Sequence, residues 1–261
     1  MTSTREILQA LASGEISVNE AEKALRMHAL GEVGNIGMLD GNRLERSGVP
    51  EVVFAETKAI DYLISIIKVM VEKNDVVLLT RMNQEKLEAI KSAYPDLIHE
   101  VSGKEDHLTV LVHTKDWPDP PTTGKIAIMT AGTSDITYAY EAVAIARLMG
   151  VKTFTFFDVG VAGIHRLIEP IKKLINEEVD AVVVFAGMEG ALPTVVASLI
   201  DIPVIGVPVP TGYGFGGKGE TALASMLQSC APGLAVVNIG NGLGGGSVAS
   251  LIAKRNAMNK E

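Results

Sequence analysis

Five short apolar segments, each followed by a helix-like segment, are the feature that most constrains the fold of this chain. They are Lys125–Thr130, Thr153–Phe157, Asp180–Ala186, Pro203–Val207 and Leu234–Ile239. The helix-like segments fall near Ile136–Met149, His165–Glu178, Leu192–Leu199, Glu220–Ser229 and Val248–Ala257. Near-continuous apolar strands that alternate with helices are typical of a parallel sheet covered on both faces. We therefore predict an α/β unit of this kind over residues 125–261.

A smaller α/β module is predicted upstream. Two capping boxes, Ser3–Glu6 and Ser17–Glu20, precede apolar helical positions and indicate a helical hairpin within the first 31 residues. Beyond it we expect strands at Glu51–Ala55, Asp75–Thr80 and His107–His113, and helices at Lys58–Glu72 and Asn83–Ala93. Three prolines between Trp117 and Gly124 mark a linker. We therefore divide the chain into an N-terminal module (1–116), a Pro-rich linker (117–124) and a larger domain (125–261).

The composition argues against several classes of function. The formal net charge is −8, which disfavours nucleic acid and anionic membranes as partners. Cys230 is the single cysteine, so no internal disulfide forms, as is usual in a reducing compartment. The N-terminus lacks a signal-peptide pattern, and no run of about 18 apolar residues occurs. We expect a soluble cytoplasmic protein that binds neither nucleic acid nor membrane.

The loops after the five predicted strands carry the candidate binding groups. In open α/β sheets, ligands bind at the edge where the strands end. Each of these loops contains glycine, which lets backbone N–H groups come close to a ligand. The candidate ligand contacts are Thr133, Ser134, Asp135, Arg166, Gly187, Gly190, Gly212, Gly214, Asn238, Asn241 and Gly242.

Two familiar phosphate-binding patterns are incomplete in this sequence. The run from Gly212 to Lys218 is similar to a Walker A loop, but glycine occupies position 219, where the Mg²⁺-binding Ser or Thr would stand. A GxGxxG pattern begins at Gly240, but it follows the last strand, and no further βαβ unit supplies the acidic ribose ligand. An NAD-dependent dehydrogenase is therefore the weaker interpretation, while backbone contact with phosphate stays open.

Several longer motifs, in their order along the chain, carry a resemblance to a known family. They are TAGTSD, FDVGVAGIHRL, AGMEGALPTVVA, PVPTGYGFGG and MLQSCAPGLAVVNIGNG. With them the chain resembles the LarB family, the pyridinium-3,5-biscarboxylic acid mononucleotide synthases of nickel-pincer nucleotide biosynthesis. The resemblance is dense over Lys125–Gly246 and looser upstream, through the capping boxes, PEVVFA and LLTRMNQEKL. The larger domain also resembles PurE-type aminoimidazole ribonucleotide carboxylases, which implies a flavodoxin-type parallel sheet.

The sequence departs from the LarB pattern at two places. Gly240 stands where an aspartate is usual, which removes a polar group from the last glycine-rich loop. Residues 57–59 read Thr-Lys-Ala where Gly-Lys-Thr is usual, so Lys58 is given no role.

The LarB resemblance implies a reaction on nicotinic acid adenine dinucleotide. The ring would be carboxylated at carbon 5, with CO₂ or bicarbonate as co-substrate, and the phosphoanhydride would then be cleaved with release of AMP. No tightly bound cofactor is expected. A pyridinium ring is too electron-poor to attack CO₂, but addition of a thiolate leaves a nucleophilic enamine, a task that suits Cys230. Taken by itself, Cys230 is more typical of a small buried hydrophobe before a turn than of a nucleophile.

Five further side chains complete the expected site. Cys230 lies at the C-terminal end of a predicted helix, where the macrodipole disfavours a thiolate, so Glu189 is the candidate base. His165 is a second acid/base or phosphate-binding candidate, with Arg166 as a phosphate clamp. Ser134 and Asp135 match a PurE-type loop that holds the ribose phosphate. Three of these residues have a structural alternative: a turn carboxylate for Glu189, a loop cap for His165 and a helix cap for Asp135.

Metal, assembly and competing functions complete the expectations. Mg²⁺ is considered because the substrate has two phosphates, but the sequence shows no ligand cluster, so a metal site is left unknown. The PurE resemblance implies a homo-oligomer, with an octamer by analogy. The alternatives are a purine-pathway aminoimidazole ribonucleotide carboxylase or mutase, and a non-catalytic nucleotide sensor. Cys230 and the N-terminal module argue against the first, and turnover would exclude the second.

Overall fold

The computed structural model describes residues 4–29, 31–33, 37–39, 43–104 and 106–259. The chain divides into two compact units. One comprises residues 1–101 with 110–117, and the other residues 102–109 with 118–261. Each is described by itself below.

The first unit begins with the expected helical hairpin. Helix α1 spans Thr4–Ala12 and helix α2 spans Val18–Ala29. The second capping box is confirmed: the Ser17 N–H donates to Glu20 Oε2 at 2.8 Å, and the Glu20 N–H donates to Ser17 Oγ at 3.3 Å. These bonds satisfy N–H groups that the start of a helix leaves without an internal partner. The first box includes Ser3, which lies outside the described residues.

A four-stranded sheet in the order β3-β4-β6-β5 follows. Its strands are β3 (Val52–Phe54), β4 (Val76–Met82), β5 (Ile98–Lys104) and β6 (His107–His113), with helices α4 (Ile60–Asn74) and α5 (Gln84–Ala93). Strand β5 was not predicted, because it lies at the sheet edge and none of its residues is fully buried, so it lacks an apolar pattern. The short elements β1 (Gly31–Val33), β2 (Gly37–Leu39) and α3 (Arg43–Ser47) were also not predicted.

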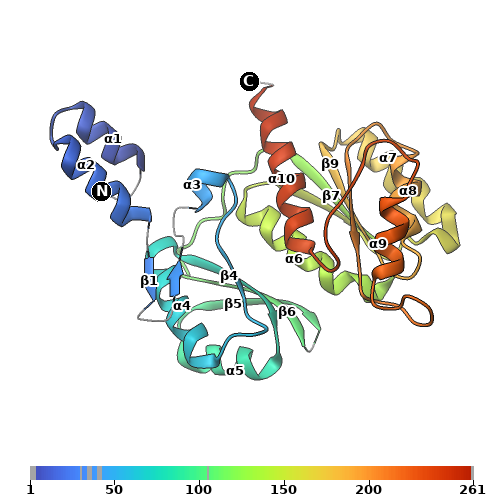
Figure 1. Cartoon of the computed structure of the whole chain (residues 1–261), viewed down its shortest axis with the longest axis horizontal. Helices are drawn as coiled ribbons and strands as arrows, with labels where there is room; N and C mark the ends of the chain where they lie inside the picture. Colours follow the sequence, from blue (N-terminus) through green and yellow to red (C-terminus); the bar gives the residue numbers. More distant parts are fainter. Residues whose placement is uncertain (1–3, 30, 34–36, 40–42, 105, 260–261) are drawn as a thin grey trace. The chain divides into compact units, whose positions relative to one another are not determined.

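The second unit is a five-stranded parallel sheet (Figure 1), as predicted. Its strands are β7 (Lys125–Thr130), β8 (Lys152–Phe156), β9 (Ala181–Ala186), β10 (Val204–Pro208) and β11 (Leu234–Val236). Their order across the sheet is β11-β10-β9-β7-β8. In chain order this is the flavodoxin-type 2-1-3-4-5 arrangement, in which the direction of winding reverses between the first and third strands.

Helices cover both faces of this sheet (Figure 1), which confirms the predicted fold class. Helices α6 (Ile136–Leu148) and α10 (Gly242–Met258) pack together on one face. Helices α7 (Ile168–Asn176), α8 (Ala191–Ala197) and α9 (Glu220–Leu227) lie on the other. Every residue of β9 is buried, and Leu174, Leu192 and Met226 from the three helices pack in one core cluster with Val182 and Val184 of this strand. Burial on both sides explains why the three central strands, β7, β9 and β10, are almost continuously apolar.

Helix α10 begins at Gly242, six residues before the predicted Val248, and its glycines explain the difference. A Cβ on Gly245 would lie 2.9 Å from Val207 Cγ2, and one on Gly246 would lie 2.7 Å from the Cα of Ala142 in α6. The helix therefore lies too close to the sheet and to α6 for larger residues. Gly245 and Gly246, which from the sequence belonged to a candidate ligand loop, are required for helix packing.

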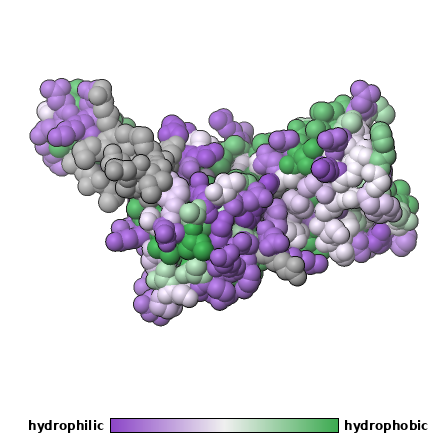
Figure 2. Space-filling view, turned by 60° about the horizontal axis from the view of Figure 1, so that its bottom comes forward, coloured by the Kyte–Doolittle hydropathy of each residue, from purple (hydrophilic) through white to green (hydrophobic). Residues whose placement is uncertain are grey.

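The described residues include no helix that is long and apolar enough to span a membrane. Figure 2 shows, on the face drawn, hydrophobic residues gathered in separate patches among hydrophilic ones.

Residues 118–261 are predicted to fold without the rest of the chain. The core cluster around β9 is built entirely from residues after the linker, so the fragment keeps its own apolar core. We expect a soluble fragment with a cooperative thermal transition, measured by circular dichroism. A fragment that shows no cooperative transition would mean that the domain boundary is misplaced or that residues 102–109 are indispensable to the second unit.

Candidate active site

A cavity of about 430 Å³ opens at the edge of the second sheet where its strands end. Residues from four loops line it, within 131–135 after β7, 160–166 after β8, 186–192 after β9 and 211–213 after β10. The topology places a crevice there, because the winding of the sheet reverses between β7 and β9. The sequence-predicted residues among its lining are Ser134, Asp135, Arg166, Gly187, Glu189 and Gly212.

Asp135 ties three of these loops together. It ends a short 3₁₀ turn, Thr133–Asp135, and one of its carboxylate oxygens accepts the Gly132 N–H at 2.9 Å. The Thr211 hydroxyl donates to the other oxygen, and the Gly187 N–H is a further donor to the carboxylate. Asp135 is only 4% exposed, so these bonds replace its water. The carboxylate therefore works as an internal connector, beyond the helix cap or ribose ligand expected from the sequence.

Burial makes the Asp135 carboxyl a weaker acid than an ordinary aspartate. Desolvation raises the pKa of this carboxyl above its ordinary value, and the hydrogen bonds from Thr211, Gly132 and Gly187 oppose that rise only in part. A group whose pKa is raised in the folded state stabilises the fold while it is protonated. Its contribution is therefore complete below the ordinary pKa and is lost as the pH rises through the folded-state pKa.

Substitution Asp135→Asn is expected to flatten the pH dependence of stability. In the wild type, the free energy of unfolding should contain a term that falls as the pH rises from about 3.9, the ordinary value for Asp. The variant lacks the titrating group, so this term should vanish from urea-unfolding curves recorded over a pH series. Asp201→Asn, at an exposed position, is the control. Equal pH slopes in wild type and Asp135→Asn would show that Asp135 does not titrate in this range.

The turn after β9 presents Glu189 to the cavity. Met188 has φ 47° and Gly190 has φ 65°, so left-handed residues flank Glu189 on both sides. For methionine this conformation costs energy, and strain of this kind clusters at functional sites. The turn is held by the Met188 N–H, which donates to the Thr211 carbonyl at 3.1 Å. Glu189 itself is exposed and lines the cavity, which suits a group that acts on a ligand.

Gly187, at the start of the same turn, has no space for a side chain. A Cβ there would lie 2.1 Å from the Thr211 carbonyl oxygen. Glycine is therefore required so that the β9 and β10 loops can approach each other.

Arg166 lies in the 3₁₀ segment Val161–Leu167, and its guanidinium group bonds in part to its own loop. One terminal nitrogen donates to the Asp158 carbonyl at 2.7 Å, and the other donates to the Gly160 carbonyl at 3.4 Å. It also pairs with the Asp158 carboxylate at 3.2 Å. Arg166 therefore shapes the wall of the cavity as well as supplying positive charge to it.

Other predicted residues lie outside the lining of this cavity. They are His165, Thr133, Gly190, Gly214, Asn238, Asn241 and Gly242. His165 and Thr133 are exposed. Asn241 caps helix α10, since its side-chain oxygen accepts the Gly244 N–H at 2.8 Å. Gly242 packs against the Tyr138 carbonyl and the side chain of Glu141.

Cys230 is exposed and does not line the cavity. It stands four residues before β11, and the neighbouring Gly233 carbonyl accepts the N–H of Val204, the first residue of β10. Cys230 therefore precedes the strands, whereas the cavity lies beyond their ends. The expectation that Cys230 and Glu189 share one site is not met within a single chain.

No group of three or more His, Cys, Asp or Glu side chains in the described part of the chain could hold a metal ion. Whether Mg²⁺ takes part in the reaction stays an open expectation from the sequence.

Comparison with known proteins identifies the family. A model of the LarB/PurE-like N-terminal domain matches residues 31–105, and a model of AIR carboxylase matches residues 125–261. The chain is a member of the LarB family. Its C-terminal domain is PurE-like, as the sequence motifs indicated.

Relatives of this LarB-family chain fall into two groups. It is 44% identical over 251 residues to an uncharacterized protein of Methanocaldococcus jannaschii, with 96% of each chain covered. It is 37% identical over 116 residues to the N5-carboxyaminoimidazole ribonucleotide mutase of the same organism, covering 44% of this chain and 68% of the mutase. Among solved structures, the chain is similar to a PurE2 variant of Treponema denticola. The match covers 52% of this chain and 81% of the variant at 18% sequence identity, with a TM-score of 0.40.

Three residues of the cavity were missed by sequence reasoning: Thr211, Met188 and Tyr213. Thr211 joins Asp135 and Met188 by hydrogen bonds, and Tyr213 lines the cavity. The only signal was their position in glycine-rich loops after strands, which also applies to many residues without a role.

Proposed function

We propose that this protein carboxylates the pyridinium ring of nicotinic acid adenine dinucleotide and cleaves its phosphoanhydride. The products would be pyridinium-3,5-biscarboxylic acid mononucleotide and AMP. The observation that carries the proposal is the combination of a LarB-type N-terminal domain with a PurE-like domain whose cavity holds Ser134, Arg166 and Glu189. The membership of the chain in a PurE-related carboxylase family supports the same class of reaction.

The proposed chemistry uses the residues of the cavity in definite roles. Arg166 and the backbone N–H groups of the glycine loops would bind the phosphates, and Ser134 would hold the ribose phosphate. The Cys230 thiolate would add to the ring, so that its aromaticity is broken and an enamine carbon can attack CO₂. Loss of the ring proton to Glu189 and expulsion of the thiolate would restore the aromatic ring. Water would then attack the phosphoanhydride and release AMP.

The position of Cys230 makes assembly part of this proposal. Within one chain the thiol precedes the strands and the cavity follows them, so a second copy of the chain is needed to bring Cys230 to the ring. A homo-oligomer of the kind expected by analogy with PurE would supply it. The exposure of Cys230 is compatible with a role at such an interface.

The direct test is the mass of the product. The protein is incubated with nicotinic acid adenine dinucleotide and ¹³C-bicarbonate, and the mixture is examined by mass spectrometry. We expect a mononucleotide that carries one labelled carboxylate, together with AMP in equal amount. AMP without a labelled mononucleotide would leave only the hydrolase activity. The absence of both products would refute the proposal.

A purine-pathway mutase is the second candidate, favoured by the 37% identity to the mutase of M. jannaschii. It would act on N5-carboxyaminoimidazole ribonucleotide and would need no thiol, because an aminoimidazole already has enamine character. Conversion of this substrate by both the wild type and Cys230→Ser would decide in its favour.

A further inference from the structure

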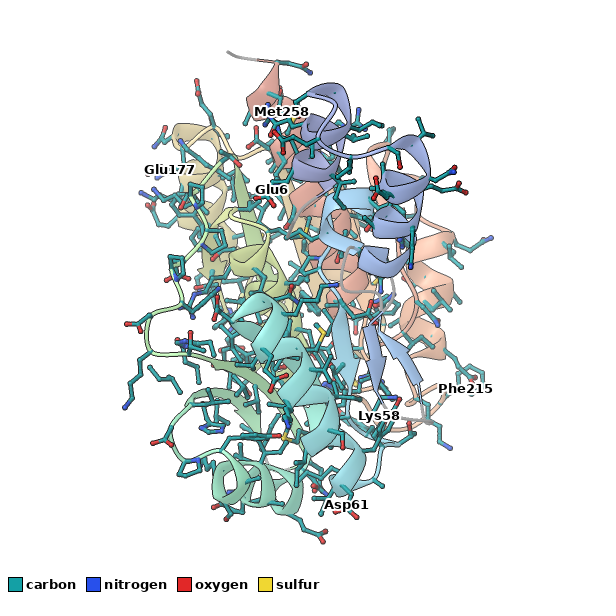
Figure 3. All side chains as sticks on the ribbon, turned by 90° about the vertical axis from the view of Figure 1, so that its left-hand side faces the viewer. Glu6, Lys58, Asp61, Glu177, Phe215 and Met258 are labelled. Carbon is teal, nitrogen blue, oxygen red and sulfur yellow. The ribbon has the colours of Figure 1, made fainter. Side chains whose placement is uncertain are left out.

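The loop between β10 and α9 carries two aromatic side chains that are exposed to solvent. Tyr213 is 82% exposed and Phe215 is fully exposed. Phe215 extends away from the ribbon in Figure 3. Aromatic residues are scarce in this chain, at 5%, and an exposed ring gains nothing from packing in the core.

The base of this loop is fixed to the cavity, whereas its tip is not. Thr211 bonds through its hydroxyl to Asp135 and through its carbonyl to the Met188 N–H. Tyr213 still belongs to the lining of the cavity. Phe215 lies two residues further along, between Gly214 (φ 72°) and Gly216 (φ 77°), whose left-handed conformations other residues rarely adopt. The loop therefore presents two rings in succession, one at the cavity wall and one beyond it.

The size of the cavity bears on what these rings could contact. At about 430 Å³ it lies in the lower part of the range of about 300–1,000 Å³ that is typical of sites for drug-sized ligands. One nucleotide half of a dinucleotide suits this volume, and the other half would then lie outside. A flat base outside the cavity and next to Tyr213 would need an apolar surface on which to stack.

We propose that Phe215, together with Tyr213, forms a stacking surface for the adenine of the dinucleotide while the pyridinium nucleotide occupies the cavity. This inference rests on the proposed function and assigns the adenine half of the same substrate. Stacking on an aromatic ring needs no hydrogen-bond partner on the protein, which fits a loop tip that consists otherwise of glycine. Phe215 would thereby distinguish a dinucleotide from a mononucleotide.

The test compares two ligands and four proteins. Dissociation constants for nicotinic acid adenine dinucleotide and for nicotinic acid mononucleotide are measured by equilibrium dialysis with wild type, Phe215→Ala, Phe215→Tyr and Ile175→Ala. Ile175, on α7 and outside the cavity lining, is 57% exposed and serves as the matched apolar control. We expect Phe215→Ala to weaken dinucleotide binding by about 5- to 100-fold, as loss of base stacking does elsewhere. Phe215→Tyr should restore it, and mononucleotide binding should change far less.

Three results would overturn the inference while the proposed function stands. They are dinucleotide binding by Phe215→Ala that equals the wild type, an equal loss for both ligands, and a change in native mass that makes Phe215 an oligomer contact. Wild type that binds the dinucleotide without converting it would refute the proposed function alone, and the stacking comparison would still decide the inference. Wild type that does not bind the dinucleotide would refute both.

Discussion

Cys230→Ser is expected to abolish ring carboxylation, with a loss of about 10⁴-fold or more, as when other enzymes lose a covalent nucleophile. The reason is that a serine hydroxyl supplies far less nucleophilic anion at neutral pH than a thiol does. The fold should be unaffected, because Cys230 is exposed and serine is nearly isosteric. Carboxylation is followed by ¹³C incorporation, and folding by the thermal transition. Near wild-type carboxylation by Cys230→Ser would eliminate the covalent mechanism.

The covalent adduct itself can be trapped. Wild type incubated with nicotinic acid adenine dinucleotide in the absence of CO₂ should gain the mass of the substrate and show dihydropyridine absorbance that acid removes. Cys230→Ser is the matched control and should show neither signal.

A complementation experiment tests whether Cys230 acts on a neighbouring copy. Cys230→Ser and Glu189→Gln chains, each expected to lose at least about 10²-fold in activity alone, are unfolded, mixed and refolded together. If every site takes Cys230 from one copy and Glu189 from another, about one quarter of the sites in a randomly mixed oligomer regain both groups. Activity near that fraction supports the shared site. If mixed oligomers form but stay inactive, Cys230 does not act in a neighbouring site.

Glu189→Gln is expected to lower turnover by about 10²- to 10⁴-fold, the usual contribution of a positioned acid or base. The substitution keeps the shape of the side chain and removes the charge that would accept a proton from the thiol or the ring. Stability should change little, because the side chain is exposed. The measurement is the rate of ¹³C incorporation at saturating substrate.

The control for this prediction is Glu169→Gln. Glu169 is an exposed carboxylate on α7, outside the cavity lining, and pairs with Lys172 at 2.8 Å on the same helix. It should keep full activity, since exposed pairs of this type contribute little. Equal activities of the two variants would show that Glu189 is a carboxylate of the turn without a catalytic role.

The sequence by itself determined the sheet of the second unit, because burial on both faces leaves a local apolar signal. Strand β7 occupies Lys125–Thr130, the bounds that the apolar run predicted, and β9 differs by one residue. The sequence also indicated which loops line the cavity, since the carboxyl ends of parallel strands meet at one end of the sheet, and four of the five predicted loops do so. Strand β5 escaped this reasoning, because an exposed edge strand has no such signal.

The tertiary structure decided what the individual loop residues do. The contact between Asp135 and Thr211 spans 76 positions of the chain, so no local pattern could reveal it. The glycines from Gly242 to Gly246 fit a phosphate loop equally well until the close approach of α6 is known.

Cys230 shows the same limit most clearly. In the sequence it stands between two ligand loops, those after β10 and after β11, which suggested that the thiol and the loops share one site. In the structure the chain returns through α9 to the beginning of the sheet before β11 starts. Each strand residue advances the chain by about 3.3 Å, so even a short strand separates the end of the sheet where the strands begin from the end where they finish. Only the three-dimensional path of the chain reveals that Cys230 lies where the strands begin and the cavity where they end.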